Sequence, residues 1–428
     1  MKKAVVIGSG AGGATAAKEL QGRFDVTILE AGGSFHPFAM PLTTVDRLKK
    51  AGLLWDEREI QLLFPNMKIR RTGDKMVLVH GAGLGGTTTI SAGNALRMDQ
   101  DLKQLGIDLD PEFAEIYREI TISTEHRNHW RKSTSLLFEA CREMNLDPQP
   151  TPKMGDYENC THCGQCVLGC PRGVKWDSRK YLDMALKNGA HRVTGCKAVK
   201  VAIQNGRALG VQVQGGLHAA FYPADLVIVA AGGFSTPVIL QNSGIACESR
   251  LFVDPVLCVA AEWKDCRQNK EVSMPFVVQR EHYILSPYFD HLSFFFNKAW
   301  RYRAQDTLSL MIKLKDSNIG NIDSGRGHRV NKVLTALDQE RLREGVAVCT
   351  DIMGRMGIDR KSIILGTINA GHPGGMLPLT KNEAATFHNP ALPENLYVAD
   401  ATLFPASLGN PPILTIIAMA KRISKLCH

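Results

Sequence analysis

The sequence GSGAGG at residues 8–13 decides the fold. It follows a short apolar run at residues 4–7 and precedes the helix-forming residues 14–21. A second apolar run, residues 26–29, then ends in the acidic residue Glu30. This order predicts a strand, a glycine-rich turn, a helix and a second strand, which is how a parallel α/β sheet begins.

The glycines of this turn and Glu30 predict a dinucleotide site. Gly8 allows the tight turn, Gly10 lets the backbone approach a pyrophosphate, and Gly13 lets the helix pack closely on the strand. The helix N-terminus favours the negative charge of the phosphates. Glu30 lies 22 residues after Gly8, at a strand end where a carboxylate can accept hydrogen bonds from ribose hydroxyls. These residues leave the choice between FAD and NAD open.

Length and composition fit a globular protein of two domains. The 428 residues are 44% hydrophobic and 22% charged, which is enough for a buried core. The 51 basic and 42 acidic residues give a net charge of +9, which suits an acidic partner or an anionic substrate and does not indicate nucleic acid. No apolar run reaches the roughly 18 residues of a membrane span, so we expect no transmembrane segment. The first apolar run stops at Ile7, and we expect a cytoplasmic protein.

Strand and helix patterns recur along the chain in separate segments. The buried-strand pattern of residues 225–231, the strand 396–400 and the apolar helix 412–426 continue the first α/β unit. Residues 255–365 contain alternating and aromatic-rich runs typical of an antiparallel sheet, and a helix over 338–356. We therefore expect an α/β (overall α+β) fold of two domains with an insertion. The expected nucleotide-binding domain comprises 1–150, 176–254 and 366–428, the cysteine-rich insertion 151–175, and the substrate domain 255–365.

Several further segments resemble the glucose-methanol-choline (GMC) oxidoreductase family. GAGLGGTTTI at residues 81–90 is similar to the family's second glycine-rich stretch, and AGGFSTPVIL at 231–240 is similar to a signature of the family. GHPGG at 371–375, VADAT at 398–402 and residues 404–415 follow in the family's order. The resemblance implies FAD rather than NAD, an FAD-binding Rossmann-like domain and a smaller substrate domain with an antiparallel sheet.

The resemblance also implies which residues hold FAD. The glycine-rich turn and Glu30 would hold the ADP half, and the second glycine-rich stretch would lie along the flavin. Ser91 stands where the family often has Asn, and Asn94 follows three residues later. The expected FAD-binding residues are Gly8, Gly10, Gly13, Glu30, Gly85, Gly86, Thr87, Asn94, Ala231, Asp400 and Pro411.

His372 and Asn410 are the predicted catalytic pair. Oxidising an alcohol requires removal of the hydroxyl proton while a hydride leaves for the flavin, and a histidine suits the first task because its pKa lies near working pH. The resemblance gives that role to His372 and makes Asn410 the neighbour that positions the substrate oxygen. Asn410 also has an interpretation as a turn or cap residue before two prolines.

Four cysteines within residues 160–170 predict an iron–sulfur cluster. Their spacing, C-x₂-C-x₂-C-x₃-C-P, is the run by which bacterial ferredoxins hold [4Fe–4S] clusters, whereas a zinc site usually shows two C-x₂-C pairs farther apart. We expect one cluster; zinc and unliganded thiols are the alternatives. The expected ligands are Cys160, Cys163, Cys166 and Cys170. A distant thiol such as Cys141 or Cys196 could replace Cys170, because the fourth cysteine of this run serves another cluster in two-cluster ferredoxins.

A flavin and a cluster in one chain predict a dehydrogenase. The flavin takes two electrons from a small-molecule alcohol, and the cluster passes them singly to a ferredoxin-like carrier or a partner redox subunit. One alternative is an electron-transfer subunit whose complex does the chemistry elsewhere, and another is the same site in reverse, as a carbonyl or alkene reductase. The aromatic run at residues 283–300 is either core or an apolar wall over the flavin.

Overall fold

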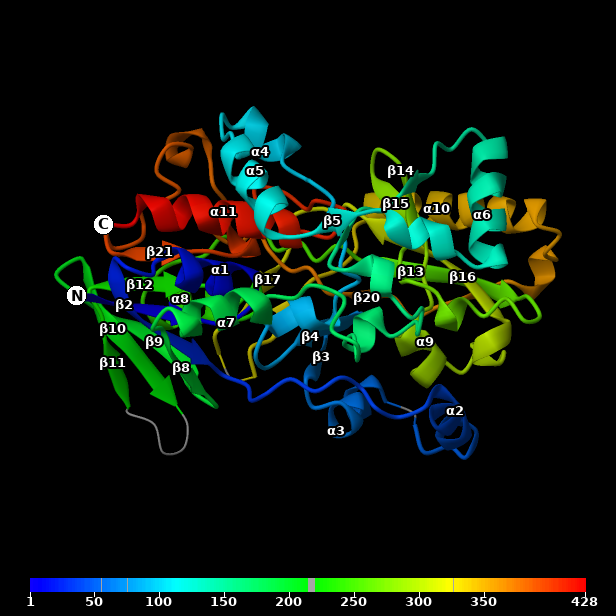
Figure 1. Ribbon diagram of the computed structural model, residues 1–428, viewed down its shortest axis with the longest axis horizontal. Coiled ribbons are helices and arrows are strands. Elements are labelled where there is room, and N and C mark those ends of the chain that lie inside the picture. The colour runs from blue at the N-terminus through cyan, green and yellow to red at the C-terminus, as the bar shows by residue number, and fades with distance from the viewer. Residues whose placement is uncertain (55, 75, 215–219, 326) are drawn as a thin grey trace.

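A parallel sheet lies at one end of an elongated molecule, and a larger, mainly antiparallel sheet lies toward the other (Figure 1). Both chain ends lie at the end that holds the parallel sheet (Figure 1). The predicted α/β architecture with an additional antiparallel sheet is therefore confirmed. The computed structural model describes residues 1–54, 56–74, 76–214, 220–325 and 327–428.

The parallel sheet has five strands in the order β21-β12-β1-β2-β8. Its central strands are buried and apolar because the helix Ala11–Glu19 and three antiparallel strands within residues 197–214 and 221–223 pack on them. Helix α1 (Ala11–Glu19) packs between α7 (Arg179–Lys187) and α11 (Ile413–Leu426). The strands are β1 (Lys2–Ile7), β2 (Phe24–Glu30), β8 (His191–Thr194), β12 (Leu226–Val229) and β21 (Leu396–Val398).

The glycine-rich turn between β1 and α1 has the close packing that the sequence predicts. Gly8 has a φ of +98°, in the left-handed region that favours glycine. A Cβ atom at Gly13 would overlap the carbonyl oxygen of Gly8. Helix α1 begins at Ala11, three residues earlier than the sequence pattern indicated, because its first turn is built from the glycines themselves.

The larger sheet has nine strands, eight of them in the order β3-β4-β20-β13-β16-β15-β14-β6, with β19 paired to β13. Helix α10 (Ala336–Arg355) packs on its central strands. Four of its strands come from outside residues 255–365. The strands are β3 (Met67–Arg71), β4 (Val77–Gly81), β6 (Gln149–Pro150), β13 (Val256–Glu262), β14 (Phe276–Gln279), β15 (Tyr283–Pro287), β16 (Thr307–Leu314), β19 (Ile364–Leu365) and β20 (Asn369–Ala370).

Smaller elements complete the described chain. A three-stranded antiparallel sheet consists of β9 (Lys197–Gln204), β10 (Arg207–Gln214) and β11 (Phe221–Pro223), and α8 (Thr236–Asn242) packs on β9. Two short pairs join β5 to β7 and β17 to β18. The remaining elements are α2 (Leu42–Lys50), α3 (Ile60–Leu63), α4 (Gln100–Gln104), α5 (Asp110–Glu119), β5 (Ile122–Ser123), α6 (Lys132–Glu143), β7 (Lys153–Met154), α9 (His291–Phe296), β17 (Asn321–Ile322) and β18 (Val330–Asn331).

The aromatic run at residues 283–300 is only partly a strand, so that part of the prediction was wrong. After β15, the side chain of Asp290 accepts hydrogen bonds from the backbone N–H groups of Leu292 and Ser293 and starts the helix α9. Phe295 of this helix packs against Phe38, with ring centroids 5.8 Å apart. Its aromatic side chains are buried, so core packing is the interpretation that the structure favours.

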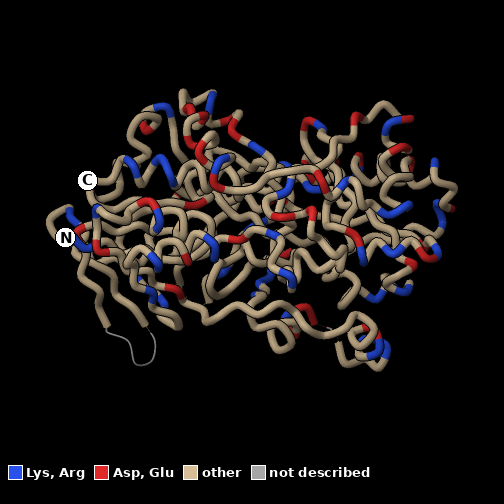
Figure 2. The backbone as a smooth tube through the Cα atoms, in the orientation of Figure 1, with Lys and Arg blue, Asp and Glu red and all other residues tan. Residues whose placement is uncertain are grey.

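Charge is distributed over the whole molecule. Blue and red segments alternate along both halves of the chain in Figure 2, so in this view the basic excess is not gathered on one element. Within the described ranges, every helix is too short or too polar to cross a membrane.

Candidate functional site

The first glycine-rich turn and the end of β2 form one hydrogen-bonded unit. The backbone N–H and the hydroxyl of Ser9 both donate to the Glu30 carboxylate, at 3.1 and 2.6 Å, and the N–H of Gly32 donates to its other oxygen at 2.9 Å. Burial raises the pKa of Glu30. The predicted ribose-binding carboxylate thus lies directly beside the predicted pyrophosphate turn.

The second glycine-rich stretch folds onto the first. The backbone N–H of Gly85 donates to the Ser9 hydroxyl oxygen at 3.1 Å, and a Cβ atom at Gly86 would lie 3.1 Å from the Cα atom of Gly10. The stretch continues as a short 3₁₀ turn, η2 (Gly86–Ile90), in which the Thr87 hydroxyl accepts a hydrogen bond from Gly81. The two glycine-rich segments, about 75 residues apart in the sequence, therefore meet at the predicted cofactor site.

The turn leaves room for a phosphate. A Cβ atom at Gly10, the N-cap of α1, would have no neighbour within 4 Å, and no side chain caps this helix. An uncapped helix N-terminus that faces open space is the arrangement that binds a pyrophosphate. The residues present therefore fit the ADP half of FAD.

Ala231 and Asp400 follow two neighbouring strands at the same edge of the parallel sheet. The Asp400 carboxylate accepts hydrogen bonds from the backbone N–H of Gly232 at 2.9 Å and from the Thr236 hydroxyl at 2.5 Å. The N–H of Ala231 donates to the same hydroxyl at 3.1 Å. Burial raises the pKa of Asp400. Both residues thus lie at the carboxyl edge where open α/β sheets bind nucleotides.

Two other predicted cofactor residues lie outside the glycine-rich stretches and the ends of the parallel strands. Asn94 is buried, its amide nitrogen lies 3.0 Å from the Met274 sulfur, and its amide oxygen accepts a hydrogen bond from Lys153. Pro411 lies just before α11, whose N-cap is Pro412. The assignment of all eleven residues to FAD stays a prediction.

His372 is oriented by Asp254, a residue that the sequence analysis missed. The Nδ1 atom of the partly exposed His372 ring lies 3.4 Å from the Asp254 carboxylate. Burial lowers the pKa of His372 to about 4; Lys313 adds to this effect, whereas Asp254 opposes it. Burial alone would raise the pKa of Asp254, but Lys313, 3.3 Å away, and His372 hold it below its usual value. The imidazole is therefore neutral at physiological pH and can accept a proton.

Asp254 also joins this histidine to the segment that carries Asn410. Its second carboxylate oxygen accepts hydrogen bonds from the Ser407 hydroxyl and, at 3.3 Å, from the backbone N–H of Gly409. The Asn410 amide itself exchanges hydrogen bonds of 3.3 and 3.4 Å with Gln279, at the end of β14. Asp254 and Gln279 carry no sequence signal, because each is an isolated polar residue far from its partners along the chain.

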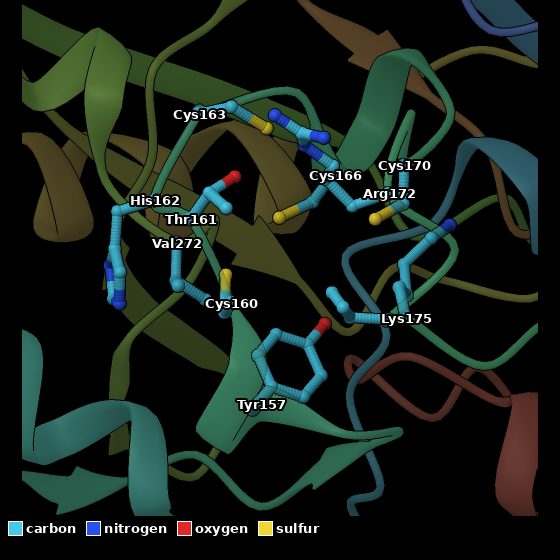
Figure 3. Close-up of a pocket in the computed structure, with 12 residues that line it drawn as sticks. Tyr157, Cys160, Thr161, His162, Cys163, Cys166, Cys170, Arg172, Lys175 and Val272 are labelled. Carbon is cyan, nitrogen blue, oxygen red and sulfur yellow. The ribbon is translucent and has the colours of Figure 1, made fainter.

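The four predicted cluster ligands line one cavity. Cys160, Cys163, Cys166 and Cys170 surround the same space in Figure 3, and Tyr157 and Lys175 lie at its border. Burial raises the pKa of the Cys160 thiol to about 11. The alternative ligands Cys141 and Cys196 are buried elsewhere and do not line this cavity.

Two glycines shape the cysteine segment. Gly164 and Gly169 both have positive φ, and a Cβ atom at Gly169 would lie 2.5 Å from the Phe35 ring. In the part of the chain that the structure describes, no three His, Cys, Asp or Glu side chains are grouped as ligands of one metal ion. The [4Fe–4S] assignment therefore stays a prediction.

A family model for the GMC oxidoreductases matches residues 3–259, which is more than half of the chain. The chain belongs to the GMC oxidoreductase family. This membership identifies it as an FAD-dependent oxidoreductase, as the resemblance implied.

Named relatives cover this GMC protein to different extents. An uncharacterised protein of Methanocaldococcus jannaschii is 27% identical over 97% of both chains. An uncharacterised GMC-type oxidoreductase of Mycobacterium tuberculosis is 29% identical over 58% of this chain, and a long-chain-alcohol oxidase of Arabidopsis thaliana is 25% identical over 56%. The matches span only 40% and 34% of those two longer relatives.

Solved structures show the same fold. Pyridoxine 4-oxidase from Mesorbium loti superposes with a TM-score of 0.73 at 15% identity, over 99% of both chains. A formate oxidase superposes with a TM-score of 0.70 at 14% identity, over 99% of this chain and 97% of the oxidase.

Two glycine substitutions separate cofactor binding from folding. We expect Gly10→Ala to fold with a thermal midpoint near that of the wild type, because a Cβ atom there meets no protein atom, but to bind FAD about tenfold or more weakly, because the Cβ crowds the pyrophosphate. Gly13→Ala should lower the thermal midpoint itself, because its Cβ overlaps the Gly8 backbone. Fluorescence titration of the apoprotein with FAD and thermal melts measure both effects. Unchanged FAD affinity in Gly10→Ala would contradict the assignment of this turn.

Proposed function

We propose that this GMC protein is a dehydrogenase that oxidises an alcohol to a carbonyl compound and delivers the electrons singly to a ferredoxin-like carrier or partner redox subunit. The observation that carries the proposal is the single cavity lined by Cys160, Cys163, Cys166 and Cys170, which adjoins the second glycine-rich stretch. When bound, FAD takes a hydride, that is two electrons and one proton, from the alcohol carbon. The hydroxyl proton is the remaining product of the oxidation, and the protein must accept it.

His372 is the group that we assign to this proton. With its Nδ1 atom toward Asp254, the ring can donate Nδ1–H to the carboxylate and keep Nε2 free as the proton acceptor. Once Nε2 is protonated, the buried Asp254 carboxylate stabilises the positive ring. The general base is thus oriented before substrate arrives.

Asn410 is the group that we assign to the substrate oxygen. The Asn410 amide nitrogen donates long hydrogen bonds to Gln279 at 3.4 Å and to the Leu408 carbonyl at 3.5 Å, and an alcohol or carbonyl oxygen of the substrate would replace the second acceptor. The bonds to Gln279 fix the amide plane, and a cavity that both residues line opens beside them. The names of similar proteins, a long-chain-alcohol oxidase and a pyridoxine 4-oxidase, support an alcohol as substrate.

The cysteine cavity suits a cluster better than a zinc ion. A structural zinc ion needs its thiolates around one point, whereas a [4Fe–4S] cluster takes each thiolate on a different iron atom. The four thiols surround a common space, and their C-x₂-C-x₂-C-x₃-C-P spacing is the run that holds [4Fe–4S] clusters in bacterial ferredoxins. A bound cluster accepts and passes one electron at a time. That property distinguishes the proposed dehydrogenase from an oxidase that reduces oxygen directly.

His372→Ala tests the chemistry, and Cys163→Ser tests the electron exit. Under anaerobic conditions, we expect a panel of primary and secondary alcohols to contain a substrate that bleaches the wild-type flavin. His372→Ala should keep FAD but bleach about 100-fold or more slowly, because the base is lost. Cys163→Ser should bleach normally but fail to reduce a viologen or ferredoxin. Bleaching at the wild-type rate in His372→Ala would contradict the proposed base. If instead no alcohol bleaches the wild type and His372→Ala still passes electrons from a redox partner, the protein is the alternative, an electron-transfer subunit.

The dependence of flavin bleaching on pH tests the histidine–aspartate pair. The wild-type rate should fall as the pH falls through about 4, because protonated His372 cannot accept a proton. Asp254→Asn removes the carboxylate that raises the His372 pKa, so the loss of rate at acidic pH (the acid limb of the profile) should move to lower pH. The rate at neutral pH should fall about 10- to 100-fold, since the protonated ring loses its counter-charge. Asparagine tolerates the positive φ of 51° at this position. An acid limb that stays in place or moves to higher pH would contradict the pairing.

A further inference from the structure

Two buried lysines, Lys153 and Lys175, donate hydrogen bonds to the segment 88–94, which begins in the second glycine-rich stretch. Lys175 borders the cavity, and only 2% of its surface is exposed. Its ammonium group donates to the backbone carbonyl oxygens of Thr88, Thr89 and Ser91 at 3.0, 2.8 and 3.0 Å. One side chain therefore connects the cavity wall to the segment that we assign to the flavin.

Lys153, on strand β7, does not line the cavity but bonds to the same segment. Its exposed fraction is 0%, and its ammonium group donates to the carbonyl oxygens of Ala92 at 3.2 Å and Ser273 at 2.6 Å, and to the Asn94 amide oxygen. Lys175 thus holds the segment 88–94 through three hydrogen bonds and Lys153 through two, while the third bond of Lys153 reaches Ser273, which follows the cavity-lining Val272.

All six of these acceptors are uncharged. Among the described residues, neither ammonium group forms an ion pair with a carboxylate, whereas the buried Lys313 and Lys332 pair with Asp254 and Asp316 at 3.3 and 2.7 Å. A buried charge without a counter-charge is costly, and folded proteins rarely keep one without a compensating group. Lys153 and Lys175 therefore lack the partner that other buried lysines of this chain have.

The cysteines of the cavity are among the groups that favour the positive charge of both lysines. Burial lowers the pKa of Lys153 to about 7, and thiolates at Cys166 and Cys160, followed by the Glu271 carboxylate, act against this effect. Burial lowers the pKa of Lys175 to about 8, and Asp177 and thiolates at Cys166 and Cys170 act against it. Both ammonium groups thus lie within electrostatic reach of the thiolates that a cluster would require.

The close approach of these groups depends on a glycine. Gly93 has a φ of +72°, and a Cβ atom there would lie 2.6 Å from the Tyr157 hydroxyl and 2.9 Å from Lys175 Cγ. The 3₁₀ turn η5 (Cys166–Leu168) of the cysteine segment also contacts η2. The cysteine segment and the flavin-lining segment therefore pack directly on each other.

We propose that Lys153 and Lys175 are the counter-charges of the iron–sulfur cluster, which stabilise its reduced, more anionic form and fasten it to the flavin segment. This inference rests on the proposed function, because it requires a cluster in the cysteine cavity. The protein's charge near a cluster is one of the factors that set its reduction potential. Two buried positive charges raise that potential and so favour transfer of electrons toward the cluster.

Neutral lysine variants of the holoprotein test the inference. We would prepare Lys153→Met and Lys175→Met anaerobically, measure iron and sulfide per chain, and titrate the cluster potentiometrically by EPR. At the midpoint potential of the wild type, the ratio of reduced to oxidised cluster should fall about tenfold in each variant. For a one-electron couple this corresponds to a midpoint potential lowered by about 59 mV. Lys49→Met is the matched control, because Lys49 also donates to two backbone carbonyls, those of Phe294 and Trp300, which belong neither to the segment 88–94 nor to the lining of the cysteine cavity. Its midpoint should not move.

The outcomes separate this inference from the proposed function. Methionine variants that keep four irons at the wild-type midpoint would overturn the role of the lysines and leave the cluster intact. A wild type without iron and sulfide would overturn the proposed function instead. If the methionine variants hold no cluster, the charge-preserving Lys175→Arg decides: restored iron content supports the counter-charge, and continued loss would overturn it by showing that shape alone matters.

Discussion

The contact between the two glycine-rich stretches is the constraint on which the rest of the site depends. Gly86 reaches the backbone of Gly10, and Gly85 donates to Ser9, only because no side chain separates them. This contact fixes the start of the segment 85–94, whose later carbonyls hold the ammonium groups of the two buried lysines. The position of the cysteine cavity beside the proposed flavin therefore follows from a close approach of two backbones.

The proposed catalytic groups depend on a different buried element. Asp254 contacts the His372 ring through one oxygen and the segment before Asn410 through the other. Lys313 balances its charge from the neighbouring strand β16, so the large sheet supports the base. The parallel sheet thus forms the nucleotide-binding edge, while the antiparallel sheet orients the residues that would act on substrate.

Local motifs predicted the fold well, whereas long-range partners could not be predicted. The turn at residues 8–13 and the cysteine spacing are encoded within a few residues, so the sequence alone predicts a dinucleotide turn and a cluster, and the structure confirms the strand–turn–helix fold around the first. Asp254 meets His372 across 118 positions, and Lys175 meets Thr88 across 87, and neither contact leaves a pattern in the sequence. The aromatic run was misassigned because one capping residue, Asp290, starts a helix inside it.

The iron and acid-labile sulfide content of the anaerobically isolated protein, with EPR after reduction by dithionite, tests the central claim most directly. The proposed electron exit predicts about four iron and four sulfide atoms per chain, bound FAD and the signal of one reduced cluster. One zinc ion per chain in place of iron, or no metal at all, would contradict it. The cysteine segment would then be structural, and the reduced flavin would need another acceptor.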